Sequence, residues 1–147
     1  MSVLEAALKL LGLSEVLLKW QGPLRELSAA RRERVAAYAG EIAACIGRAA
    51  AAAEQLGEPN LDKRARRKLV GEIVREVGRL RGYVEDVAET LKNHLDGRKL
   101  SGVKRRLQSL EISPGELEKD GADTRTLVDR FIEAEGYMRA LIDRLKS

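Results

Sequence analysis

Apolar residues recur at alternating spacings of three and four along this chain, which is the period of an amphipathic α-helix. One segment places on a single side Val35, Tyr38, Ile42, Cys45, Ala49, Ala52 and Leu56. The next segment repeats the spacing at Val70, Ile73, Val77, Leu80, Val84, Val87 and Leu91. A third set near the end of the chain comprises Leu127, Phe131, Ala134, Met138, Leu141 and Leu145. No run alternates as a strand would, so the sequence predicts an all-α protein.

Proline, glycine and capping residues divide this pattern into five predicted helices. Proline costs least at the start of a helix, and it stands at or near three predicted starts, Pro23, Pro59 and Pro114. Gly57 and Gly97 follow apolar segments and predict helix ends, and Asn60 is a predicted N-cap. The predicted helices are 2–20, 23–56, 61–96, 99–110 and 123–146, with a short helical turn at 114–119.

The two longest predicted helices are each about 50 Å long, and the link between them is only about four residues, which predicts an antiparallel hairpin. A turn centred between residues 58 and 59 places opposite charges together in three pairs, Arg31 with Asp86, Arg32 with Glu85, and Glu54 with Lys63. Close approach of the two helices is predicted where the alanines of 49–53 face Gly71, Gly78 and Gly82. We therefore predict an antiparallel helical bundle of four to five helices around this hairpin, forming a single domain over residues 1–147.

Composition limits the compartment and the partners. Charged residues make up 34% of the chain and aromatic residues 3%, which suits helices with long solvated faces. The single cysteine cannot form an intrachain disulfide, and no signal peptide or uncharged apolar stretch of about 18 residues is evident, so we expect a cytoplasmic protein. The net charge of +4 is uneven, because residues 58–112 carry fourteen basic and nine acidic side chains.

The sequence offers little side-chain chemistry for catalysis. His94 is the one histidine and Cys45 the one cysteine, too few for a zinc site of thiolates and imidazoles. Cys45 lies on the apolar side of its predicted helix, which favours an inert core thiol. No phosphate-binding loop or nucleotide fingerprint occurs. We therefore expect no catalytic residues, no metal, no cofactor and no small-molecule substrate.

The first predicted helix, 2–20, has an unusually wide apolar surface. Its four charges fall in a strip of about 120° on a helical wheel. The remaining arc includes Leu4, Leu8, Leu11, Val16, Leu18 and Trp20. Two interpretations follow: the helix lies in a groove and is buried on three sides, or part of its arc contacts a protein partner or a membrane.

A cluster of cations opens the third predicted helix. It comprises Lys63, Arg64, Arg66, Arg67 and Lys68. The N-terminus of a helix is already positive, so these charges oppose the local field and indicate an anionic partner. The alternative is a solvated turn. No aromatic residues are interleaved with the cluster, which argues against stacking recognition of single-stranded nucleic acid.

The run "YVEDVAE", which contains the acidic pair Glu85 and Asp86, carries a resemblance to a known group of proteins. With its apolar first helix and long hairpin, the chain resembles the helical HeLo domains and plant immune-receptor coiled-coil domains. The resemblance implies a cell-death helical bundle that assembles and permeabilises membranes through residues 2–20.

Three functions are compatible with these features. The leading expectation is a non-enzymatic protein-interaction or oligomerisation module, in signalling or defence, with a protein partner or a second copy of the chain. The alternative is a membrane-disrupting, pore-forming effector that an acidic membrane surface recruits and whose helix 2–20 inserts. A third is a polyanion or nucleic-acid binder that uses the basic cluster of 63–68.

Overall fold

The structure is a computed structural model that describes residues 24–91, 105 and 124–146. Three helices are described: α3 (Ala29–Leu56), α4 (Lys63–Leu91) and α7 (Thr124–Lys146). No strand occurs in the described ranges, and the predicted all-α class is confirmed there. Predicted helix 2–20 and all but one residue of 99–110 lie outside the described residues, so the bundle of four to five helices stays a prediction.

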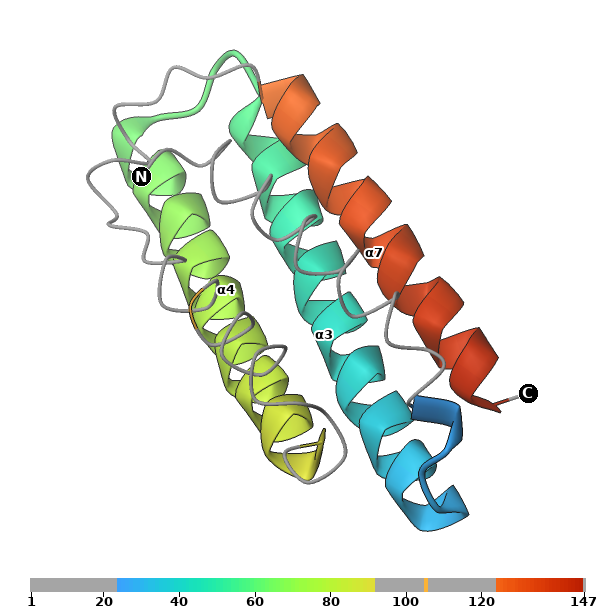
Figure 1. The fold of residues 1–147 in the computed structure, drawn as a ribbon. Helices are drawn as coiled ribbons and strands as arrows, with labels where there is room; N and C mark the ends of the chain where they lie inside the picture. The colour runs from blue at the N-terminus through green and yellow to red at the C-terminus, as the bar shows by residue number, and fades with distance from the viewer. Residues whose placement is uncertain (1–23, 92–104, 106–123, 147) are drawn as a thin grey trace.

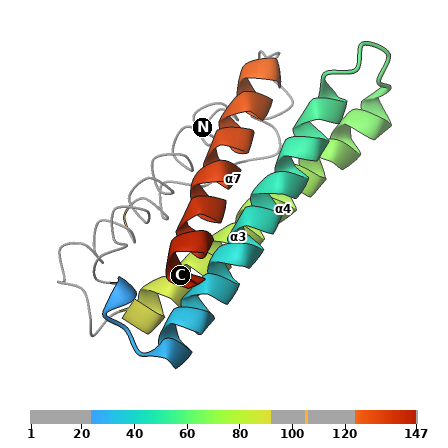
Figure 2. The same ribbon diagram turned by 90° about the vertical axis from the view of Figure 1, so that its right-hand side faces the viewer.

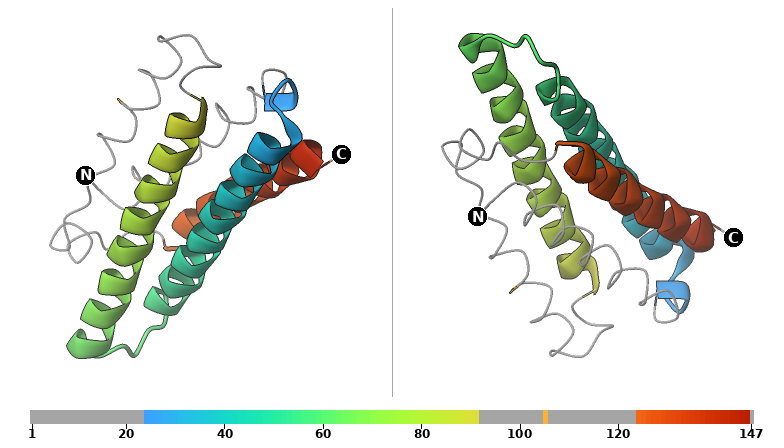
Figure 3. Two further views of the ribbon diagram at one scale, coloured as in Figure 1. Left: turned by 90° about the horizontal axis from the view of Figure 1, so that it is seen from below. Right: turned by 90° about the horizontal axis from the view of Figure 1, so that it is seen from above.

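The helix α3 lies between the other two (Figure 1). It packs extensively against both α4 and α7, whereas α4 and α7 make little contact with each other. The chain runs up α3, down α4 and down α7, so α3 is antiparallel to both neighbours (Figures 1 and 2). The predicted antiparallel hairpin is therefore the α3–α4 pair, and α7 covers a second flank of α3 (Figure 3).

The start of α3 differs from the predicted helix 23–56. Residues 24–25 are helical, but a turn and a bend at 26–27 separate them from the long helix, which begins at Ala29. Ser28 is its N-cap, because the hydroxyl oxygen accepts a hydrogen bond from the Arg31 backbone N–H at 3.3 Å. A serine cap satisfies an N–H group that has no partner within the helix. Pro23 therefore did not mark the true start, and Ser28 did.

The link between α3 and α4 is longer than predicted. Gly57 ends α3 as expected, although its φ of −75° is right-handed and requires no glycine. Asp62 rather than Asn60 opens α4, since its Oδ1 accepts a hydrogen bond from the Ala65 N–H at 2.7 Å. The link therefore covers residues 57–62.

This longer link displaces the predicted register. The rings of Tyr38 and Tyr83 lie 6.4 Å apart, and the guanidinium of Arg48 binds Glu76. The tyrosine contact lies four residues, about one helical turn, from the register in which Arg31 would face Asp86, and the Arg48–Glu76 contact lies seven residues, about two turns, from it. The helices are antiparallel as predicted, but the three predicted charge pairings rest on the wrong offset.

The core is formed by the apolar sides that the periodicity predicted. All seven predicted positions on α4 are buried, from Val70 to Leu91. On α7 the described positions from Phe131 to Leu145 are buried as well. On α3 the predicted side is buried except for half-buried Tyr38, and a second buried flank comprises Ala36, Ala39, Ala43, Ile46, Ala50 and Ala53. The two flanks of α3 explain how one helix packs against two.

The glycines of α4 do not mediate helix approach, so that prediction was wrong. Gly71, Gly78 and Gly82 are exposed, and a Cβ atom at any of them would meet no heavy atom within 4 Å. The small side chains that allow close packing of α3 are its buried alanines. Glycine at an exposed helical position is less favourable than alanine by about 1 kcal/mol, so these three positions weaken α4.

Candidate functional site

The basic cluster lies in the first two turns of α4, next to the link that joins it to α3 (Figure 1). Its members are the residues that the sequence singled out, Lys63, Arg64, Arg66, Arg67 and Lys68. Arg66 is half-buried and the other four are exposed. Asp62 caps the same turn through the Ala65 N–H, so the cluster begins directly at the helix N-terminus.

The electrostatics of the basic cluster favour an anion. The first turn of α4 contains no acidic residue. Unpaired N–H groups make a helix N-terminus positive, so each cation there is unfavourable by about 0.3–1 kcal/mol before solvent screening. An anion bound at this end would interact favourably with both the dipole and the side chains. Three of the five are arginines, whose planar guanidinium groups bind carboxylate or phosphate through two hydrogen bonds.

The other predicted site residues are not part of this cluster. Glu85 and Asp86 lie on α4 and are both exposed, near the opposite end of the helix. The Asp86 backbone carbonyl accepts a hydrogen bond from the Thr90 hydroxyl at 2.9 Å, a contact within the helix. The predicted partner or membrane residues of helix 2–20 lie outside the described residues, namely Leu4, Leu8, Leu11, Val16, Leu18 and Trp20.

Sequence reasoning missed a polar cluster between α3 and α4. Glu76 is buried, and its Oε1 accepts from Arg48 Nε of α3 at 3.0 Å and lies 3.7 Å from Arg79 Nη1. Its other oxygen, Oε2, is buried without a hydrogen-bond partner. A signal was available in the sequence, because Glu76 follows Ile73 by three and precedes Leu80 by four. That spacing places a carboxylate on the apolar side of the helix.

Cys45 borders the same polar cluster. It is buried, and Arg48 Nη2 lies 3.5 Å from its sulfur. Burial raises the pKa of the Cys45 thiol, and the hydrogen bond and negative charge of Glu76 raise it further, while the nearby arginines lower it. The thiolate is the reactive form of cysteine, so a raised pKa together with burial makes this thiol unreactive at neutral pH.

We expect a thiol reagent such as DTNB to label Cys45 at pH 7.5 at least a hundredfold more slowly in buffer than in denaturing urea, because labelling requires the protein to unfold.

The raised pKa of the Cys45 thiol also has a consequence for the stability of the protein. The folded thiol keeps its proton where the unfolded thiol loses it, so stability falls as pH rises above about 8.5. Comparing urea midpoints of the native sequence and Cys45→Ala between pH 7.5 and 9.5 isolates this effect. Rapid labelling of the folded protein would contradict the burial of this thiol.

No group of three or more His, Cys, Asp or Glu side chains that could hold a metal ion occurs in residues 24–91 and 124–146. His94 lies outside the described residues. Charged side chains gather in the exposed basic cluster and around buried Glu76. The first can bind an anion, and the second is already occupied by arginine.

By length and composition, α3 could also cross a membrane. An 18-residue window within it carries at most two charged residues. In this fold 56% of that window is buried, and α3 packs between α4 and α7. The core helix of a globular protein has the same character, so this property alone does not distinguish a membrane protein.

Comparisons with protein-family models, curated proteins and solved structures find no match to this chain. The resemblance to HeLo and plant immune-receptor coiled-coil domains therefore rests on the sequence features alone and stays a prediction. The described helices define an all-α protein with an exposed basic end.

Proposed function

We propose that this protein is a non-enzymatic helical-bundle module that binds an acidic protein surface through its basic cluster. The observation that carries the proposal is the crowding of five cations, Lys63, Arg64, Arg66, Arg67 and Lys68, at the positive end of α4. Such an arrangement is unfavourable in the isolated chain and becomes favourable when an anionic partner is present. The predicted bundle of four to five helices supplies a rigid support for it.

A protein partner suits the basic cluster better than single-stranded nucleic acid does. Base stacking requires exposed aromatic side chains beside the cations. The described tyrosines, Tyr38, Tyr83 and Tyr137, are partly buried and pack against the core. Carboxylates on a partner need only the exposed guanidinium and ammonium groups. The third expectation, polyanion or nucleic-acid binding, remains the competitor that the experiment must separate.

We expect the protein to bind a polyglutamate peptide at low salt, with an affinity that falls at least tenfold as salt screens the charges. Replacing Arg64, Arg66 and Arg67 together by glutamine should weaken this binding at least tenfold and reduce its salt dependence. Fluorescence anisotropy of a labelled peptide across a salt series measures both effects. Thermal stability should be maintained, because the first-turn cations oppose the dipole of α4.

The matched control replaces three exposed arginines elsewhere, Arg25, Arg34 and Arg75, by glutamine. This control variant loses the same net charge as the cluster variant. If the peptide binds at the basic cluster, the control variant should bind it more tightly than the cluster variant does. Equal weakening by both variants would indicate a diffuse charge effect. Tighter binding to duplex DNA than to polyglutamate would favour the third function, and no binding to either would contradict the proposal.

Membrane disruption is a second candidate function, and the apolar character of α3 is compatible with it. That helix is long and apolar enough to enter a bilayer, and the sequence predicts a further apolar helix at 2–20. Leakage of dye from vesicles that contain acidic lipid separates the two functions. Leakage that Leu4→Glu and Leu11→Glu abolish, without loss of helical content, would establish the second candidate. Vesicles that stay sealed in the presence of the unmodified protein would exclude it.

A further inference from the structure

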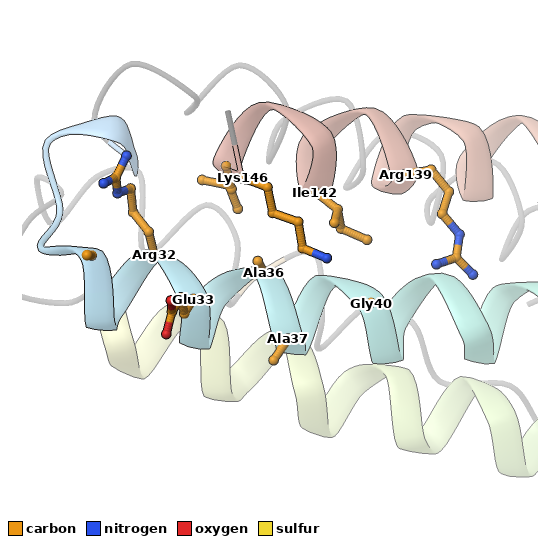
Figure 4. Close-up of a pocket in the computed structure, with 10 residues that line it drawn as sticks. Arg32, Glu33, Ala36, Ala37, Gly40, Arg139, Ile142 and Lys146 are labelled. Atoms are coloured by element: carbon orange, nitrogen blue, oxygen red, sulfur yellow. The ribbon is translucent and has the colours of Figure 1, made fainter.

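A groove of about 620 Å³ lies between the N-terminal half of α3 and the C-terminal end of α7 (Figure 4). A groove of this size falls within the range of ordinary small-molecule sites, about 300–1,000 Å³. From α3 the described lining residues are Ala29, Arg32, Glu33, Ala36, Ala37 and Gly40, and from α7 they are Arg139, Ile142, Leu145 and Lys146. This region is near the opposite end of α3 from the basic cluster (Figure 1).

The base of the groove is apolar and built from small residues. Ala36, Ile142 and Leu145 are buried in the core between the two helices. Gly40 leaves open space, since a Cβ atom there would meet no heavy atom within 4 Å. The alanines and glycine of α3 therefore form a shallow floor, while isoleucine and leucine of α7 form an apolar wall. Such a surface accommodates a short hydrocarbon chain.

The polar side chains around this floor are mostly cationic. The described lining residues include three cations, Arg32, Arg139 and Lys146, and one carboxylate, Glu33. Figure 4 shows Arg32 and Arg139 toward opposite ends of the groove, with Lys146 between them. The Arg32 Nε is buried without a hydrogen-bond partner. Arg139 Nη2 lies 3.7 Å from Glu135 Oε1, one turn away on the same helix.

We propose that this groove binds a small amphipathic anion, with one acidic head group on a short apolar chain. The head group, a phosphate or carboxylate, binds between Lys146 and Arg139, and the chain lies over Ala36 and Gly40 against Ile142. Charge complementarity indicates an acidic head group, because the described lining residues include three cations and one carboxylate. The small-residue floor identifies the chain. Neither feature depends on the proposed role of the basic cluster.

Octyl phosphate is the probe that combines both parts of this ligand. We expect calorimetry to show that it binds at least tenfold more tightly than inorganic phosphate, which lacks the chain, or 1-octanol, which lacks the charge. Titration of vesicles that contain phosphatidic acid then identifies the source of the anion. Binding to those vesicles through the groove indicates a membrane lipid, whereas binding of monomeric octyl phosphate alone indicates a free metabolite of this chemistry.

Gly40→Leu tests the position of the site. The new side chain enters the open space above the floor, so we expect octyl phosphate to bind at least tenfold more weakly while the helix is preserved. Gly78→Leu on α4 is the matched control, because it also lies in a helix with open space around its Cβ, and it should leave binding unchanged. Arg139→Gln combined with Lys146→Gln should weaken octyl phosphate about tenfold and leave 1-octanol unaffected.

Several results would overturn this inference. Equal binding of octyl phosphate to Gly40→Leu and to the unmodified protein would place the ligand elsewhere. Equal affinity for 1-octanol and octyl phosphate would show that the groove binds apolar chains without selecting an anion. If the basic-cluster variant lost octyl phosphate binding while Gly40→Leu kept it, the ligand would bind at the basic cluster of α4 and not in the groove. Retention of binding in that variant distinguishes this site from the one in the proposed function.

Discussion

Phe131→Ala is expected to lower the free energy of unfolding by about 3–5 kcal/mol. Phe131 is the only phenylalanine of the chain and is fully buried on the side of α7 that packs against α3. Truncation removes its contacts and leaves a cavity between two helices that cannot readily collapse. Total stability is about 5–15 kcal/mol for a domain, so this loss is a large fraction of it. Urea unfolding followed by circular dichroism measures the change.

The adjacent residue provides the control. Ile132 is 54% exposed on the outer side of α7, so Ile132→Ala should change stability by less than about 1 kcal/mol. The two substitutions change the same helix at neighbouring positions and differ mainly in burial. If both had equally small effects, α7 would not be packed against α3 as the structure describes.

The second large effect concerns the buried carboxylate between α3 and α4. Arg48→Met should lower stability by about 1–3 kcal/mol, because it leaves a buried acceptor without its main partner. The side chain of Glu76 is only 11% exposed, whereas that of Arg48 is 46% exposed, so solvent screens part of the interaction. Arg79, at 3.7 Å, provides limited compensation. Adding Glu76→Leu to Arg48→Met should restore stability to within about 1 kcal/mol of the native sequence, since a hydrophobic replacement removes the buried charge.

An exposed ion pair of the same length is the matched control. Arg130 Nη1 and Glu133 Oε2 of α7 are also 3.0 Å apart, with both side chains more than 40% exposed. Arg130→Met should therefore cost no more than about 1 kcal/mol. Equal losses for Arg48→Met and Arg130→Met would show that burial of Glu76 does not strengthen its dependence on arginine. Failure of the double variant to recover would indicate that Glu76 has a further role.

The apolar period predicted much of the fold because it reports burial directly. On α4 every residue of the predicted side is buried, and the helix is antiparallel to α3 as the short link implied. The second flank of α3 was missed because alanine is compatible with both buried and exposed helical positions. The glycines of α4 misled for a different reason. At 100° per residue they lie about 150° from the apolar side, so their regular spacing carried no packing information.

The candidate sites were predictable only in part. The basic cluster is contiguous in sequence, so its charge could be found without a structure. The groove joins Arg32 and Gly40 of α3 to Arg139 of α7, residues about a hundred positions apart. No local pattern brings such residues together. Asp62, rather than the predicted Asn60, caps α4, so the link is longer than predicted. The register of α3 and α4 differs from the predicted one by about one to two helical turns. Detail of this kind depends on competing local hydrogen bonds.

The central place of α3 has a consequence for the order in which the chain folds. Its contacts with α4 close only the short link 57–62, whereas its contacts with α7 must close a loop that includes all of α4 and the residues up to 123. Loop closure costs more entropy as the loop lengthens, so the hairpin gains its contacts at lower initial cost. Until α7 docks, the alanine flank of α3 is open to other apolar chains. That interval is where the growing polypeptide is most susceptible to misassembly or capture by a chaperone.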